Sequence, residues 1–130
     1  MAVRLMNVPG LSQPPGYSHL GIGSGGNLVF TAGQVPLDSR GELVGTGDHR
    51  AQAEQVLRNL LSALAVASAR PEDVIKTTVY VVGASHEAQN VVWQAVQDSP
   101  VGAAPSTLVG IALLGYQGQL VEIEAIALVD

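Results

Sequence analysis

The sequence predicts an α+β fold of the α/β-sandwich type, in which one mixed sheet carries two helices on one face. Two segments have the apolar spacing of amphipathic helices, and runs typical of strands lie before, between and after them. The strand run at 74–82 is apolar on both of its faces, and two helices can cover only one face of a sheet. All elements are expected to form one domain spanning residues 1–130.

The N-terminal part of the chain is predicted to be mostly irregular. Residues 9–26 are rich in Gly, Pro and Ser and are expected to form an arm without regular structure. A strand is predicted at 27–34, where consecutive apolar residues form its centre. A turn-rich stretch follows at 36–41, and residues 42–44 are expected to form a short return strand.

Two helices are predicted from capping residues and apolar periodicity. Asp48 is expected to cap a helix that extends to about Ser68 and that Pro71 ends, and Ser85 is expected to cap a second helix reaching about Asp98. The residues expected to point into the core are Ala53, Val56, Leu57, Leu60, Leu61 and Leu64 in the first helix and Ala88, Val91, Val92, Ala95 and Val96 in the second.

Three strands are predicted in the second half of the chain, at 74–82, 106–114 and 119–129. The segment at 115–118 is expected to be a hairpin connection between the last two. Strict alternation along the first of these strands predicts two apolar faces, with Ile75, Val79 and Val81 on one and Val74, Tyr80 and Val82 on the other.

Composition excludes several classes of protein. The chain has no cysteine, which excludes disulfides, cysteine-bound metals and a thiolate nucleophile. Hydrophobic residues make up 47% of the chain, which excludes intrinsic disorder, and the net charge of −5 disfavours nucleic acid as a partner. No apolar stretch approaches the roughly 18 residues of a membrane span, and the N-terminus lacks the apolar core of a secretory signal. We therefore expect a cytoplasmic protein without membrane contact.

The sheet face without helices is expected to meet another subunit. Only 13% of the residues are charged, which is low for the surface of a small monomer. Along 119–129 the period of two places Glu122 and Glu124 on this contact face, whereas the opposite face is wholly apolar and suits the helices. Two interpretations stay open: the carboxylates lie at the rim or bond to nearby donors, or one of them is a general acid/base in a cleft between subunits.

Seven pieces of sequence, taken together and in this order, resemble the YjgF/Rid (reactive intermediate deaminase) family. They are Tyr17 in the arm, LVFTAGQVPLD at 28–38, QVLRNLLSAL at 55–64, DVIKTTVYV at 73–81, Asn90, PST at 105–107 and VEIEAIALV at 121–129. The resemblance covers nearly the whole chain. It implies a chorismate-mutase-like fold and a homotrimer with three clefts between its subunits.

The resemblance also implies an activity and a set of site residues. Members of the best-known type hydrolyse 2-imino or 2-enamino acids to 2-keto acids and ammonia, without a metal or an organic cofactor. Tyr17 matches the arm tyrosine that closes the cleft, and Gly33 matches the glycine whose backbone lines it. Asn90 matches the helix asparagine near the cleft, and Thr107 matches a cleft-lining position on the strand. Glu122 matches the glutamate that positions the attacking water. No residue is expected to bind a metal.

One position departs from the family pattern. Deaminase-type members carry an arginine two positions before the site of Thr107, and here that position is Pro105. An arginine fork grips a carboxylate with two charge-assisted hydrogen bonds, whereas proline has no donor. The only lysine is Lys76, and nothing basic follows it. We therefore expect weak or no activity on 2-imino acids, and a ligand that is neutral or cationic.

The leading hypothesis is a Rid-like enzyme that hydrolyses or tautomerises an imine or enamine lacking a carboxylate, with Glu122 as acid/base and Pro105 among the residues lining its cleft. The alternative is a non-catalytic trimer that binds a small molecule or a partner protein. A ribonuclease is a third possibility, but six basic residues against eleven acidic ones argue against it.

Overall fold

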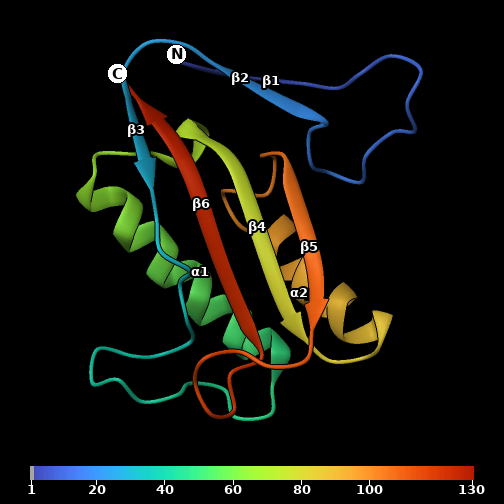
Figure 1. Ribbon diagram of the computed structural model, residues 1–130, viewed down its shortest axis with the longest axis vertical. Helices are drawn as coiled ribbons and strands as arrows, with labels where there is room; N and C mark the ends of the chain where they lie inside the picture. Colours follow the sequence, from blue (N-terminus) through green and yellow to red (C-terminus); the bar gives the residue numbers. More distant parts are fainter. Residues whose placement is uncertain (1) are drawn as a thin grey trace.

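The computed structural model describes residues 2–130 and contains a four-stranded sheet, a two-stranded sheet and two α-helices (Figure 1). The strands of the larger sheet, in spatial order, are β3 (Asn27–Phe30), β6 (Val121–Val129), β4 (Val74–Val82) and β5 (Ser106–Ile111). β4 and β5 are parallel, and the other neighbours are antiparallel. In Figure 1 both helices, α1 (His49–Val66) and α2 (His86–Gln97), lie behind this sheet. The predicted mixed sheet with helices on one face is confirmed.

The helices begin where their capping residues predict. The Asp48 carboxylate accepts a hydrogen bond from the Ala51 N–H at 3.0 Å, and the Ser85 hydroxyl accepts one from the Ala88 N–H at 3.2 Å. The stripe predicted for α1 is buried except for Leu61, which is half-buried. In α2 the prediction is wrong for Val91, which is 37% exposed. The core lies between these stripes and the helix-facing residues of the sheet, which include Val79, Val81, Val121, Ile123, Ala125 and Ala127.

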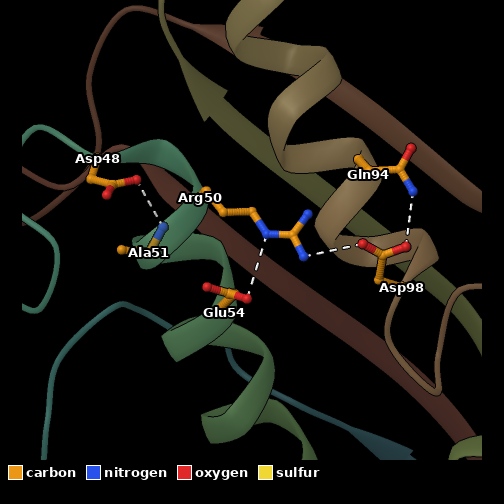
Figure 2. A network of polar contacts seen from close by, with 6 residues as sticks. All are labelled: Asp48, Arg50, Ala51, Glu54, Gln94 and Asp98. Atoms are coloured by element: carbon orange, nitrogen blue, oxygen red, sulfur yellow. Dashed lines mark hydrogen bonds and ion pairs between the residues drawn. The ribbon is translucent and has the colours of Figure 1, made fainter.

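An exposed polar network joins the two helices at their outer surface (Figure 2). Arg50 of α1 contacts Asp98 at 3.1 Å and Glu54 at 3.5 Å, and Gln94 of α2 donates to Asp98 at 2.9 Å. The hydrogen bond from Gln94, together with Arg50, lowers the pKa of Asp98 below its ordinary value. Because these side chains are exposed to solvent, the network contributes little to the stability of the fold.

Strict alternation fails at the start of β4, so the prediction for its first two residues is wrong. The pairing with β6 is irregular between Val74 and Lys76. This bulge turns Val74 into the core beneath the helices, whereas Ile75 packs on the opposite side of the sheet, against a small cluster that includes Leu128.

The prediction of a wholly irregular arm is also wrong. β1 (Val3–Met6) pairs antiparallel with β2 (Leu20–Gly23), and the pair packs on Ile75 and Leu128 at one end of the face without helices. Both strands are short, and two glycines interrupt β2, so neither shows a readable apolar alternation. The helix-free face of the four-stranded sheet is called the open face below.

Four further predictions differ from the structure. β3 ends at Phe30, β5 ends at Ile111 and β6 begins at Val121, and residues 42–44 form only an isolated bridge, from Leu43 to Leu37. The connection at 115–118 is not a hairpin, because β4 lies between β5 and β6. Apolar patterning identifies strands but does not state which of them pair. No helix within residues 2–130 is long and apolar enough to span a membrane.

Candidate functional site

The open face carries the carboxylate that the sequence singles out. Glu122 is half-buried on β6, and its Oε1 accepts a hydrogen bond from the Gln119 side chain at 3.0 Å. The other oxygen, Oε2, points at the backbone of Gly33. We call Glu122, Gly33 and Gln119 the acidic half-site.

A bulge places Gly33 against this carboxylate. Thr31 N–H donates to the Ala125 carbonyl at 3.0 Å, and Gln34 exchanges both backbone hydrogen bonds with Ile123. Residues 32 and 33 thus lie opposite the single residue Glu124, and the chain bends outward. A Cβ on residue 33 would lie 2.1 Å from Oε2 of Glu122, so only glycine allows this approach.

Two glutamines hold the chain that leads into Glu122. Gln119 is 3% exposed, donates to the Val121 carbonyl and to Glu122, and accepts from the Tyr116 N–H at 3.1 Å. Gln52 of α1 is fully buried and accepts from the Leu120 N–H at 2.7 Å. Each amide is satisfied by backbone on both sides, which fixes the segment before β6.

A second carboxylate on the open face has a partner of its own. The Tyr80 hydroxyl donates to Oε1 of Glu124 at 2.5 Å, and Tyr80 is the register partner of Glu122. The hydrogen bond to Glu124, followed by burial and by the charges of both glutamates, raises the pKa of Tyr80 above its ordinary value. The Glu124 carboxylate therefore already accepts a hydrogen bond from Tyr80, whereas Oε2 of Glu122 faces the backbone of Gly33.

Tyr17 and Asn90 lie together, but on the other side of β5. They line a cavity of about 240 Å³ with Gln89, Trp93, Ser106 and Leu108. The Tyr17 ring meets the Trp93 ring edge-on, with 5.8 Å between their centroids. This lining is aromatic, aliphatic, amide and hydroxyl, with no charged side chain, and we call it the aromatic half-site.

Pro105 and Thr107 lie at the start of β5. Pro105 is buried, and only its carbonyl is used, as the acceptor for the Thr77 N–H at 3.0 Å. Thr107 faces the open side, where its hydroxyl accepts from the Lys76 ammonium at 2.7 Å. Lys76 thus lies beside Thr107, two residues from Pro105, where the resemblance predicts that an arginine is lacking.

Within a single subunit, the six predicted site residues do not form one cluster. Glu122 and Gly33 form one group, and Tyr17 and Asn90 form another. Thr107 shares the open face with Glu122, but β4 separates their strands and their register differs by two residues, which places their Cα atoms about 12 Å apart. A larger hollow, of about 500 Å³, lies beside the first turn of α2, and none of the six residues lines it.

Sequence reasoning missed Gln119, Gln52 and Lys76. A single buried glutamine does not disturb the apolar periodicity of its segment, because the neighbouring apolar residues still show the pattern. The sequence shows Lys76 only as a lysine within a predicted strand. Its contact with Thr107 arises because β4 and β5 are parallel neighbours. Within residues 2–130 no three His, Asp or Glu side chains gather in a way that would hold a metal ion.

Comparison with known proteins finds relatives along almost the whole chain. A profile of the family described as Endoribonuclease L-PSP matches residues 11–129. A RutC family protein from Pyrococcus horikoshii is 48% identical over 56 residues, so the match spans only 44% of that relative's length. A protein from Dermatophagoides farinae named 2-iminobutanoate/2-iminopropanoate deaminase is 28% identical over 128 residues, covering 98% of this chain and 97% of that protein.

Solved structures share the fold. YyfB from Yersinia pestis, a Rid family protein of unknown function, is 35% identical with a TM-score of 0.88, covering 99% of this chain and all of that one. The YjgF gene product of Escherichia coli is 28% identical with a TM-score of 0.65, covering 95% and 92%. Since the family profile spans nearly the whole sequence, this chain belongs to the Endoribonuclease L-PSP family, which is the YjgF/Rid family.

Proposed function

We propose that this protein hydrolyses or tautomerises an imine or enamine that lacks a carboxylate, in clefts between the subunits of a homotrimer and without a cofactor. The observation that carries the proposal is the Glu122 carboxylate, whose Oε2 lies beside the glycine backbone while Gln119 holds Oε1. A full-length relative named as an imino acid deaminase supports the reaction class.

The chemistry needs one carboxylate and one water. A protonated imine carbon is already electrophilic, so the water adds to it while Glu122 takes the proton that the water loses. Glu122 then gives that proton to the nitrogen and takes the proton of the newly formed hydroxyl as the C–N bond breaks, which releases ammonia or an amine and leaves a carbonyl. With an enamine the same carboxylate takes a proton from the nitrogen and delivers it to carbon, which gives the imine. Its role in both steps requires a fixed position more than a strong base.

The separation of the half-sites and the exposed apolar side chains support the proposed trimer. Phe30 is 68% exposed and Leu28 is 62% exposed, and both lie on β3 at the edge of the open face. A second copy on this face covers them and sets its aromatic half-site opposite the acidic half-site of the first. Each cleft is then complete only in the assembly.

We expect sedimentation at micromolar concentration to give a trimer. Phe30→Glu places a charge in the covered face and should dissociate it. Val66→Glu is the matched control, because Val66 is 90% exposed at the end of α1, on the helix side, and this variant should stay trimeric. A wild-type protein that sediments as a monomer contradicts the shared cleft.

The proposed absence of a substrate carboxylate rests on the charges of the open face. Pro105 offers no donor, and Lys76 is a point charge already engaged with Thr107. Glu122 and Glu124 together outweigh this one cation. The aromatic half-site adds no charge, so that it suits a neutral or cationic substituent.

A matched pair of substrates tests this point. We expect kcat/KM for 2-iminopropionate to be at least about 100-fold below that for the imine in which a methyl group replaces the carboxylate, measured as ammonia release from imines generated in situ. Robust turnover of 2-iminopropionate that Lys76→Met abolishes would show that the lysine serves as the anion anchor, and would overturn the proposed substrate class. RNA cleavage, the activity that the family description names, is disfavoured by the acidic charge of the chain.

A further inference from the structure

The loop that carries Tyr17 has little regular structure to hold it. Residues 7–19 connect Met6 of β1 to Leu20 of β2, and the loop contains three prolines and two glycines. Its own backbone hydrogen bonds are few: Leu11 N–H donates to the Val8 carbonyl at 3.3 Å, and Gly16 N–H to the Pro14 carbonyl at 2.9 Å. Side chains must therefore order it.

His19 uses both of its ring nitrogens for this purpose. Nδ1 lies 2.9 Å from the Val8 N–H, and Nε2 lies 3.0 Å from the Ser12 carbonyl. Because a backbone N–H can only donate, Nδ1 must be the unprotonated nitrogen, and Nε2 carries the hydrogen that Ser12 accepts. The neutral Nε2–H tautomer alone makes both bonds. The His19 backbone N–H adds a third link, to the Asn7 side chain at 3.3 Å.

The loop closed in this way is docked on the body of the protein through the two residues before His19. The Ser18 hydroxyl donates to the Ala103 carbonyl at 2.8 Å, and the Tyr17 ring packs edge-on against Trp93 of α2. The ring centroids of Tyr17 and His19 are 6.5 Å apart. The imidazole thus links the far part of the loop to the residues that dock it.

We propose that His19 is the positioning residue of Tyr17: as a neutral imidazole it holds the loop against α2, and its protonation releases the loop. An imidazolium presents an N–H to the Val8 N–H, which breaks that hydrogen bond and sets two donors against each other. Histidine side chains change charge between about pH 5 and 8. Acid therefore favours the undocked loop. Release of Tyr17 would open the proposed cleft, so that consequence, unlike the docking itself, rests on the proposed function.

Few other ionisable groups are near enough to produce the same transition. His19 and Tyr17 are the only ionisable side chains between residues 5 and 23. Of the elements packed on the loop, β1 contributes Arg4 and β2 contributes none. α2 contributes His86 and Glu87 in its first turn, and Asp98 caps its last turn beside Gln97, which Gly16 of the loop approaches. His86 is the other histidine among these groups, so an experiment must distinguish its effect from that of His19.

Trp93 allows the docking to be measured without a substrate, since it is the only tryptophan of the chain. We expect the wild-type fluorescence to shift to the red between pH 8 and 5 as Tyr17 leaves the indole. His19→Asn keeps an acceptor near the Nδ1 position but does not titrate, so this variant should retain the docked emission at every pH. His19→Ala should show the undocked emission throughout, with faster hydrogen exchange over residues 7–19 only.

The control variants are His86→Gln and His49→Gln, both of which should keep the wild-type transition. A wild-type emission that does not change with pH, a transition that survives in His19→Asn, or a docked emission in His19→Ala would each overturn the proposal. Because the readout needs no imine, a failed turnover assay with a normal fluorescence transition would reject the proposed function alone.

Discussion

Glu122→Gln is expected to lower the rate of imine hydrolysis by about 10²-fold or more, with no loss of folding or assembly. The amide has the size of the carboxylate, and its oxygen still accepts from Gln119, which lies 3.0 Å from Oε1 in the wild type. What it cannot do is take a proton from water. Steady-state ammonia release on the carboxylate-free imine measures the loss, and ligand affinity is measured in parallel.

Glu124→Gln is the matched control for this prediction. It lies on the same strand and the same face two residues further on, and its carboxylate is engaged by the Tyr80 hydroxyl. Its rate should stay within about 10-fold of the wild type, because a group that is not the acid/base contributes only indirectly. Equal losses in the two variants would mean that the charge of the open face matters, and not Glu122 itself.

Gly33→Ala tests the role of the Glu122 carboxylate by displacing it. The new Cβ would lie 2.1 Å from Oε2, and a flexible carboxylate can move away more readily than the backbone can. We expect the rate to fall while stability changes little. If Glu122→Gln and Gly33→Ala both retain the wild-type rate, Glu122 is not the acid/base. If no imine is turned over but a ligand binds all variants alike, the non-catalytic binding trimer is the better description.

The parts of the fold that sequence predicts well are those determined by neighbours in the chain. The stripes of α1 and α2 and their caps at Asp48 and Ser85 depend on contacts within one or two turns, so periodicity suffices. The helix-facing side of β6 is equally clear, because five small apolar residues alternate there without interruption.

The parts that sequence does not predict depend on pairing between distant strands. The bulges at 32–33 and after Val74 arise where one strand has more residues than its partner. The sequence of one strand alone does not show this mismatch. The wrongly predicted hairpin at 115–118 has the same origin. The candidate site inherits this limit: a resemblance marks Glu122 and Tyr17, but their separation into two half-sites is visible only once the sheet order is known.

The buried side chain of Gln52 connects α1 to the segment that positions Glu122. It is fully buried in α1, and its Nε2 donates to the Gly45 carbonyl at 3.1 Å and to the Gly118 carbonyl at 3.0 Å. Its Oε1 accepts from the Leu120 N–H at 2.7 Å. One amide thereby ties the helix to the loop before it and to the segment that leads into Glu122.

Gln52→Leu should therefore destabilise the protein by about 3 kcal/mol or more, since leucine fills the space but leaves buried backbone groups without partners at a cost of about 1–3 kcal/mol each. Gln55→Leu, on the same helix, is the control, because Gln55 bonds only to the neighbouring side chains of Asn59 and Arg58, and its change should stay within about 0.5 kcal/mol. Urea denaturation at one fixed protein concentration compares them. A Gln52→Leu protein as stable as the control would mean that water replaces all three bonds, and that Glu122 is positioned by Gln119 without support from α1.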